Sequence, residues 1–302
     1  MTLGYDRPLY LLAFDHRGSF EKGLFGAEEP VSAEVKAGIV DAKELIFEAH
    51  GQAVEKGGVP AAAAGVLVDE EFGASVARRA KAQGTPLAMP VERSGQDEFQ
   101  FEYGEDFAAH IEAFDPTFAK VLVRYNPEGD PQLNARQTER LARLSGWLRQ
   151  HQRKFLFELL VPPTTEQLDR YEDQSSYDRE LRPSLVVEVI RLLQGADVEP
   201  DVWKIEGLDQ AEDCRRVVAQ ARRGGRPGVM CIILGRGADE ARVLGWLRVA
   251  ASVEGFDGFA VGRTIWYEAL KAFLAQGISR HEAVHRIAGR YQEIFAAYVA
   301  AS

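Results

Sequence analysis

Cysteine is scarce in this sequence, which has only Cys214 and Cys231 among its 302 residues. The two do not form a Cys-x-x-Cys pair, so a disulfide framework is not expected. Long apolar runs are also lacking, since none approaches the roughly 20 residues that a helix needs to span a bilayer. The amino terminus, M-T-L-G-Y-D-R-P, has no basic segment followed by an apolar one and does not resemble a signal peptide. These absences predict a cytoplasmic protein with no membrane partner.

An excess of positive charge is lacking as well. The chain has 36 Lys and Arg residues against 46 Asp and Glu residues, a formal net charge of -10. Such a balance argues against nucleic acid or an anionic membrane as a partner. A small anionic substrate remains compatible with it, because a local basic pocket can lie in an acidic surface.

The sequence does contain a regular alternation of short apolar runs with longer amphipathic stretches. Eight runs have about the length of a strand and are rich in Val, Ile, Leu or Phe. They cover residues 9–14, 64–68, 87–91, 119–125, 154–161, 202–206, 229–235 and 258–262. This pattern, without a linker, predicts one (β/α)8 TIM barrel domain over residues 1–302. The alternative, a doubly wound sheet, would usually carry a Gly-rich turn after its first strand, and D-H-R-G-S is not such a turn.

Several helices can be placed from their end signals. Residues 238–252 have apolar residues at helical spacing and Asp239 near the start. Residues 184–195 begin with Ser184 as a candidate N-cap and end in glycine. Ser279 and Glu282 are expected to form a capping box at the start of the last helix.

Polar residues interrupt several of the predicted strands. In D-V-W-K-I-E-G-L (201–208), Lys204 and Glu206 share one face, because side chains two apart in a strand point the same way. Trp203 and Ile205 share the other face. Lys120, Glu158 and Lys204 lie in the fourth, fifth and sixth strands, and adjacent strands of a barrel would bring them together.

This cluster has two interpretations. A buried ion pair is one, but such pairs are weak evidence for stability, because apolar residues often replace them without loss. The other is Schiff-base catalysis, in which a neutral lysine amine attacks a ketone. Burial and a neighbouring cation both favour a neutral amine, and Lys120 beside Lys204 would supply that cation. Glu158 could then transfer the protons.

A phosphate site is expected after the last two strands. I-L-G-R-G-A-D-E (233–240) and A-V-G-R-T (260–264) place glycines and arginines where barrels bind phosphate, and glycine lets backbone N–H groups approach an anion. The candidate residues are Gly235, Arg236, Gly237, Gly262 and Arg263. The alternative is two ordinary tight turns with solvated arginines.

The motifs F-D-H-R-G-S, K-V-L-V-R-Y, F-L-F-E-L-L, V-W-K-I-E-G-L and G-F-A-V-G-R-T-I-W together resemble class I tagatose-1,6-bisphosphate aldolases and the related sulfofructose phosphate aldolases. The resemblance runs in the same order over almost the whole chain. D-V-W-K-I-E-G-L-D, I-L-G-R-G and G-F-A-V-G-R-T are more closely similar to a domain of some bacterial 5-dehydro-2-deoxygluconokinases of inositol catabolism, where it follows the kinase. The kinase half is absent from this sequence, so a free-standing form is expected.

The resemblance implies a role for each matching position. Lys204 would form the Schiff base, Glu158 would act as acid and base, and Lys120 and Asp15 would complete the catalytic set. The implied reaction cleaves a phosphorylated deoxyketogluconate to dihydroxyacetone phosphate and malonate semialdehyde, without a cofactor. From charge alone, Arg17 or Arg124 could bind the substrate carboxylate.

Three further points remain from the sequence. H-E-A-V-H (281–285) matches a zinc-binding pattern, but no third histidine follows it, so no metal is expected. A sugar-phosphate-binding regulatory barrel without turnover is the rival to the aldolase. Tyr291, Phe295 and Tyr298 are expected to pack on the barrel, with a second subunit of a homo-oligomer as the alternative.

Overall fold

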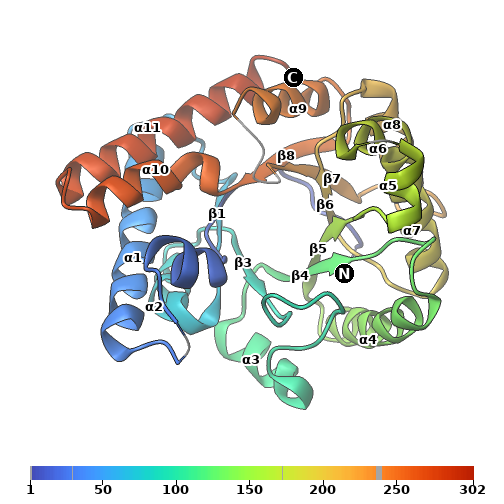
Figure 1. Ribbon diagram of the computed structural model, residues 1–302, viewed down its shortest axis with the longest axis horizontal. Helices are drawn as coiled ribbons and strands as arrows, with labels where there is room; N and C mark the ends of the chain where they lie inside the picture. Colours follow the sequence, from blue (N-terminus) through green and yellow to red (C-terminus); the bar gives the residue numbers. More distant parts are fainter. Residues whose placement is uncertain (1, 29, 172, 236–239) are drawn as a thin grey trace.

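The computed structural model describes residues 2–28, 30–171, 173–235 and 240–302. Its centre is a closed barrel of eight parallel strands in which each strand pairs with the next and β8 pairs with β1 (Figure 1). The strands are β1 (Leu9–Ala13), β2 (Ala64–Leu67), β3 (Leu87–Pro90), β4 (Phe118–Arg124), β5 (Lys154–Leu160), β6 (Val202–Glu206), β7 (Met230–Leu234) and β8 (Phe256–Val261). The predicted (β/α)8 TIM barrel is therefore confirmed, and each predicted strand has its counterpart.

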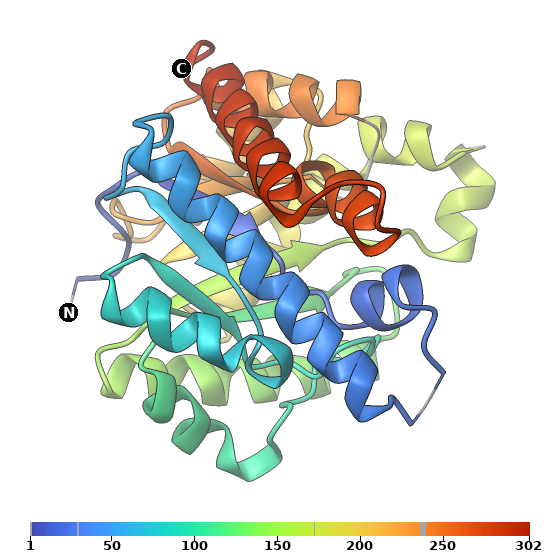
Figure 2. The ribbon, with the colours of Figure 1, turned by 90° about the vertical axis from the view of Figure 1, so that its left-hand side faces the viewer.

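Helices surround the barrel, and Figure 2 shows α1 and α11 lying side by side along one flank. The α-helices are α1 (Ala33–Glu55), α2 (Glu70–Ala82), α3 (Phe107–Phe114), α4 (Pro131–Gln150), α5 (Thr165–Tyr171), α6 (Gln174–Glu180), α7 (Arg182–Gly195), α8 (Ala211–Ala221), α9 (Glu240–Ala251), α10 (Arg263–Leu274) and α11 (Arg280–Val299). Two short elements join them, the π-helical turn η1 (Ser19–Leu24) and the 3-10 turn η2 (Gly104–Asp106). None of the described helices is long and apolar enough to cross a bilayer.

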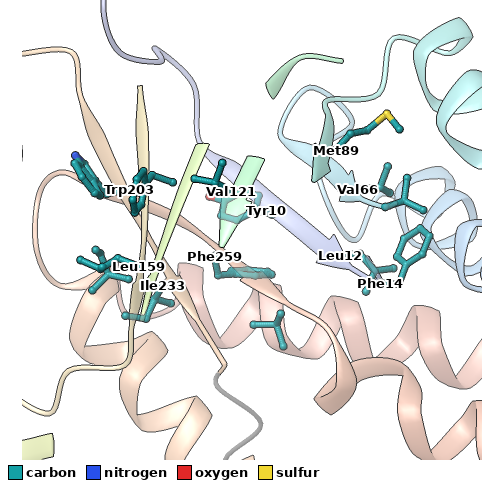
Figure 3. Close-up of a cluster of buried hydrophobic side chains, with 14 of the residues drawn as sticks. Tyr10, Leu12, Phe14, Val66, Met89, Val121, Leu159, Trp203, Ile233 and Phe259 are labelled. Carbon is teal, nitrogen blue, oxygen red and sulfur yellow. The ribbon is translucent and has the colours of Figure 1, made fainter. Parts of the chain in front are cut away.

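The strands have two buried faces, which is why their sequences are nearly continuous apolar runs. One set of alternate residues, including Leu11, Leu156 and Ile232, fills the barrel interior. The other set packs against the helices in a larger core (Figure 3). In β6, Trp203 belongs to this outer core, as the alternation predicts. The polar residues of the interior set follow these apolar residues along the strands, so they lie toward the carboxyl ends of the strands.

The helix ends test the predicted caps. Ser279 caps α11, because its hydroxyl accepts a hydrogen bond from the Glu282 backbone N–H at 3.2 Å. The prediction for Ser184 is wrong: α7 begins at Arg182, two residues earlier. Pro183 explains the difference, since proline suits the first helical turn, where its missing N–H has no partner in any case. Asp239 lies outside the described residues.

The carboxyl-terminal aromatic residues pack on the barrel, as expected. The hydroxyl of Tyr291 donates to the backbone oxygen of Tyr10 at 2.6 Å, and that of Tyr298 donates to the backbone oxygen of Phe256 at 2.5 Å. Phe295 lies edge-on to the Tyr10 ring, with centroids 4.9 Å apart. The last helix is thereby fixed to β1 and β8.

Candidate active site

The three polar residues predicted to meet in the barrel lie in direct contact. Glu158 pairs with Lys204 across the β5–β6 ladder. Its Oε1 is 2.8 Å from the Lys204 Nζ, and its Oε2 is 3.0 Å from the Lys120 Nζ. Lys120, Glu158 and Lys204 are only 1%, 7% and 5% exposed. One buried carboxylate therefore joins two buried lysines.

Lys120 lies at the centre of a cluster of carboxylates. Besides Glu158, its Nζ donates to Asp15 Oδ2 at 2.9 Å and to Glu92 Oε1 at 2.6 Å. Burial alone would lower the pKa of Lys120, but these three carboxylates outweigh burial and raise it well above its usual value. Lys120 is thus a permanent cation, as the sequence suggested, although Glu158 lies between it and Lys204.

The carboxyl groups of Asp15 and Glu158 respond in the opposite way. Burial disfavours the charged form of each, but the nearby lysines more than compensate and lower the pKa of both carboxyl groups. Lys120 acts most strongly on Asp15, and Lys204 on Glu158. Both groups are therefore carboxylates at neutral pH, and Glu158 can accept a proton from the amine beside it.

Two neighbouring cavities border this cluster and share Glu158 and Lys204 in their linings. The first, of about 170 Å³, is also lined by Asp15, Arg17 and Glu92 and by the loop 93–96. The second, of about 270 Å³, reaches Gly235, Gly262 and Arg263 after β7 and β8. Arg124 and His16 line both cavities. A bound molecule that contacts Lys204 could therefore extend into both cavities.

The predicted phosphate residues lie around the second cavity. Arg263 begins α10, and Gly262 precedes it with no side-chain cap on that helix. Gly262 is required sterically, because a Cβ there would lie 2.3 Å from the backbone oxygen of Ala13. A Cβ at Gly235 would meet only ordinary contacts, at 3.7 Å or more. Arg236 and Gly237 lie outside the described residues.

The two arginines named for a substrate carboxylate have different surroundings. Arg17 is 8% exposed, and its guanidinium donates to Glu102 Oε2 at 2.7 Å and to the Glu92 backbone oxygen at 2.9 Å. Arg124 is half-buried, and its Nη1 donates to the backbone oxygen of Gln96 at 2.9 Å. Both arginines thus contact the loop after β3. Arg17 does so partly through a carboxylate, whereas the Arg124 guanidinium, among the described residues, donates to one neutral backbone oxygen that a ligand could replace.

Sequence reasoning missed two residues of the site, His16 and Glu92. Each follows a strand closely, His16 after β1 and Glu92 after β3, which was the signal that identified Asp15. Burial, together with Lys204 and Arg263, outweighs the effect of Asp15 and lowers the pKa of His16 to about 4, so its ring is neutral at pH 7. Its Nδ1 is buried without a hydrogen-bond partner among the described residues.

A second buried ion pair, between Lys43 and Asp69, lies next to the segment that follows β1. Lys43, on α1, contacts Asp69, which follows β2 and caps α2 by accepting from the Phe72 N–H at 2.9 Å. The Lys43 Nζ lies 3.4 Å from the backbone oxygen of His16. The pair therefore holds the segment that carries Asp15 and His16 against α1 and α2.

The His-rich motif of the last helix lies elsewhere. The Nδ1 atom of His285, on α11, is 3.2 Å from Nε2 of Gln52, on α1. Within the described ranges, no group of three or more His, Cys, Asp or Glu side chains could hold a metal ion.

Comparisons with known proteins give a family and a fold. The family described as "Uncharacterized protein conserved in bacteria (DUF2090)" matches residues 5–302. No curated protein matches the sequence. A solved structure of a Schiff-base-forming fructose-1,6-bisphosphate aldolase is similar, with 15% identity and a TM-score of 0.55 over 90% of this chain and 94% of its own.

Two further solved structures are similar at comparable levels. An archaeal fructose-1,6-bisphosphate aldolase, with its catalytic lysine bound to the carbinolamine intermediate, has 14% identity and a TM-score of 0.57 over 94% of each chain. Cgl0159 from Corynebacterium glutamicum has 17% identity and a TM-score of 0.60 over 97% of this chain and 88% of its own. At such identities the likeness establishes the barrel fold.

Proposed function

This chain belongs to the DUF2090 family, and from the geometry of its site we propose that it is a class I aldolase that acts through a Schiff base on Lys204. The observation that carries the proposal is the buried contact of 2.8 Å between the Lys204 amine and Glu158. Class I aldolases need an amine that can lose its proton and a group that can take it. The similar barrels of Schiff-base-forming aldolases support the same reaction class.

The first half of the reaction forms the iminium. Glu158 takes a proton from the Lys204 ammonium, and the neutral amine attacks the substrate carbonyl carbon. The proton that the nitrogen loses as the new C–N bond forms passes to the carbonyl oxygen, which becomes the carbinolamine hydroxyl. The protonated Glu158 then returns its proton to the carbinolamine hydroxyl, which leaves as water, and the C=N⁺ bond forms. Lys120 remains protonated throughout, because its contacts with three carboxylates stabilise the charged form of its amine.

The second half breaks the carbon–carbon bond. Glu158, again a carboxylate, removes the proton of the hydroxyl group two carbons from the iminium carbon. The bond between the two intervening carbons breaks, an aldehyde forms, and the electron pair moves to the iminium to give an enamine. Protonation of the enamine carbon and hydrolysis by water then release the ketone product and regenerate the amine. The proposed reaction needs no cofactor.

The substrate we propose is 6-phospho-5-dehydro-2-deoxy-D-gluconate, which would give dihydroxyacetone phosphate and malonate semialdehyde. This six-carbon molecule carries a phosphate at one end and a carboxylate at the other. Arg263 and the start of α10 in the second cavity suit the phosphate. Arg124 suits the carboxylate. Tagatose-1,6-bisphosphate and sulfofructose phosphate are the alternatives drawn from the sequence resemblance.

Reduction with borohydride in the presence of dihydroxyacetone phosphate tests the reaction class. We expect a stable adduct on the peptide that contains Lys204, identified by mass spectrometry, because borohydride reduces an iminium to a secondary amine. Binding of dihydroxyacetone phosphate without a trapped lysine would instead favour the regulatory barrel. A product assay over phosphorylated ketoses and keto acids would then identify the substrate.

Replacing each of the two arginines in turn tests which end of the substrate it binds. Arg263→Ala should raise KM for any phosphorylated ketose about 10- to 100-fold, because a charged hydrogen bond contributes about 1.5–3 kcal/mol. Arg124→Ala should do so only for substrates with an acidic group at the far end. Arg248→Ala, at an exposed position on α9, is the matched control and should leave KM unchanged. Equal effects of the Arg124 change on all substrates would contradict the assignment.

A further inference from the structure

Gln137, on α4, is a fully buried amide that contacts both the end of β4 and the loop after β3. Its Nε2 donates to the backbone oxygen of Arg124, the last residue of β4, at 3.0 Å. Its Oε1 accepts from the backbone N–H of Phe99, in the loop after β3, at 3.3 Å. The Arg124 guanidinium donates to Gln96 of the same loop. One side chain thus links the backbone of Arg124 to the loop that its guanidinium contacts.

A second amide of α4 holds the same stretch of backbone. The Nδ2 of Asn134 donates to the backbone oxygen of Asn126 at 2.7 Å, and its Oδ1 accepts from the Gln137 Nε2 at 3.1 Å. The backbone oxygens on either side of Tyr125 are therefore both bound by side chains of α4. These amides carry no charge, so they fix the backbone without competing for an anion.

The loop after β3 is also bound to α4 by charged side chains. The Nη2 of Arg136 donates to the Oε2 of Glu98 at 2.7 Å, and Arg140 contacts the other oxygen of this carboxylate. Arg140 also donates to the backbone oxygen of Phe99 at 2.9 Å. Because Gln96 lines the first cavity, α4 fixes one wall of that cavity.

The lining of the first cavity suits a ligand with an acid group. It contains more cations than acidic side chains: Arg17, Arg93, Lys120, Arg124 and Lys204 against Asp15, Glu92 and Glu158. Within the part of the chain that the structure describes, neither Arg93 nor Arg124 forms an ion pair. Arg93 is exposed, whereas Arg124 is half-buried and its backbone is held by α4. Arg124 is therefore the unpaired cation whose position the fold determines.

We propose that Gln137 is a positioning residue, which fixes Arg124 beside the loop after β3 and thereby sets a preference for ketones that carry an acid group. The inference rests on the proposed aldolase function and on the role given there to Arg124. When an acid group replaces the Gln96 oxygen, the guanidinium changes its partner while Gln137 still holds the backbone. A side chain that starts from a fixed backbone loses less conformational entropy on binding, so its contact with the ligand is stronger.

Two ketones that cannot be cleaved measure this preference. In 5-oxohexanoate the ketone and the carboxylate have the same spacing as in the proposed substrate, but the hydroxyl group needed for cleavage is missing. The neutral counterpart is 5-oxohexanamide. Borohydride trapping at Lys204 gives a second-order rate for each ketone. The wild-type protein should trap the acid about 30-fold faster, because a charged hydrogen bond contributes about that factor.

Gln137→Met keeps most of the side-chain volume but removes both hydrogen bonds. It should lower the ratio of the acid rate to the amide rate about tenfold and change the amide rate by less than about threefold. In an Arg124→Ala background it should not lower the ratio further. Gln220→Met is the matched control, because Gln220 is a buried amide that donates to Gln194 at 2.9 Å between α8 and α7. This control should keep the wild-type ratio.

An unchanged ratio in Gln137→Met, or an equal loss for both ketones, would show a merely structural role and overturn the proposal. If that variant does not fold, Gln137→Asn replaces it with the same expectation, because the shorter amide cannot reach both partners. A wild-type protein that traps dihydroxyacetone phosphate but has no preference for the acid would overturn this inference alone. A wild-type protein that traps no ketone at Lys204 would instead overturn the proposed function, so the two failures are distinguishable.

Discussion

Replacing Lys204 with alanine should lower kcat/KM for aldol cleavage by at least about 10⁴-fold, because the amine converts the substrate carbonyl into an electron-withdrawing iminium. Without that iminium, the electron pair of the breaking bond loses the acceptor that the proposed mechanism provides. The same change should abolish the borohydride adduct. Steady-state kinetics and peptide mass mapping of the trapped protein would measure both effects.

The geometry explains why Lys204, and not Lys120, is the expected nucleophile. Lys120 contacts three carboxylates, and its raised pKa keeps it protonated. Within the described ranges, Lys204 contacts one carboxylate, Glu158, which can also take its proton. Lys204 also lines both cavities, so a carbonyl bound in either one can lie near its amine.

A second substitution at Lys204 and a control at another lysine test whether Lys204 acts as a nucleophile or only as a positive charge. Lys204→Arg keeps a cation beside Glu158 but cannot lose its proton near neutral pH, so it should be as inactive as the alanine variant. Lys271→Ala removes an exposed lysine from α10 and should retain full activity. An adduct that persists in Lys204→Ala would assign the Schiff base to another lysine and refute the proposed mechanism.

The fold could be predicted because the barrel strands are buried on both faces. Such strands read as apolar runs, and their number and spacing are nearly enough to define a (β/α)8 barrel. The contact of Glu158 with Lys204 followed from the same argument, since both are inward-facing residues of neighbouring strands. Helix starts were harder to predict, as Ser184 shows, because Pro183 lies in the first turn and α7 begins earlier, at Arg182.

The missed part of the site lies on loops, where sequence periodicity gives no guidance. Glu92 reaches Lys120 because Arg17 and Glu102, which are 85 residues apart, fix the loop after β3. That pairing depends on how β1 and β3 are placed in the barrel, so it could not be found from spacing. The sequence therefore predicted the candidate residues within the strands and directly after β1, β7 and β8, but not the loop after β3.

We expect Lys120 to contribute to stability as well as to the proposed chemistry, and the dependence on pH distinguishes the two contributions. Burial opposes its charge, but the three carboxylates raise its pKa, so the stability contributed by that charge is complete below the unfolded lysine value of about 10.4 and is lost as pH rises through the folded value. The pKa values of Asp15 and Glu158 are lowered, so their contribution is present above about pH 4 and is lost as pH falls through the folded values. The wild-type cluster is therefore stabilising between these limits.

Lys120→Met keeps most of the side-chain volume but removes the cation from three buried carboxyl groups. At pH 8 we expect the free energy of unfolding to fall by about 3–5 kcal/mol, the usual loss when one partner of a buried ion pair is removed. Without the cation, burial should raise the folded pKa values of these carboxyl groups above their unfolded values. The variant should therefore regain stability as the pH falls toward 5, whereas the wild-type protein should not.

Urea unfolding of both proteins at pH 5 and pH 8 measures this difference. Lys81→Met is the matched control, because Lys81 contacts Asp115 at 2.6 Å on the exposed surface and should be near wild type at both pH values. A Lys120→Met deficit that is equal at the two pH values would mean that Lys120 acts through packing alone. A deficit that shrinks in acid would show that the lysine neutralises the carboxylates, which is the condition that keeps Lys120 from acting as the nucleophile.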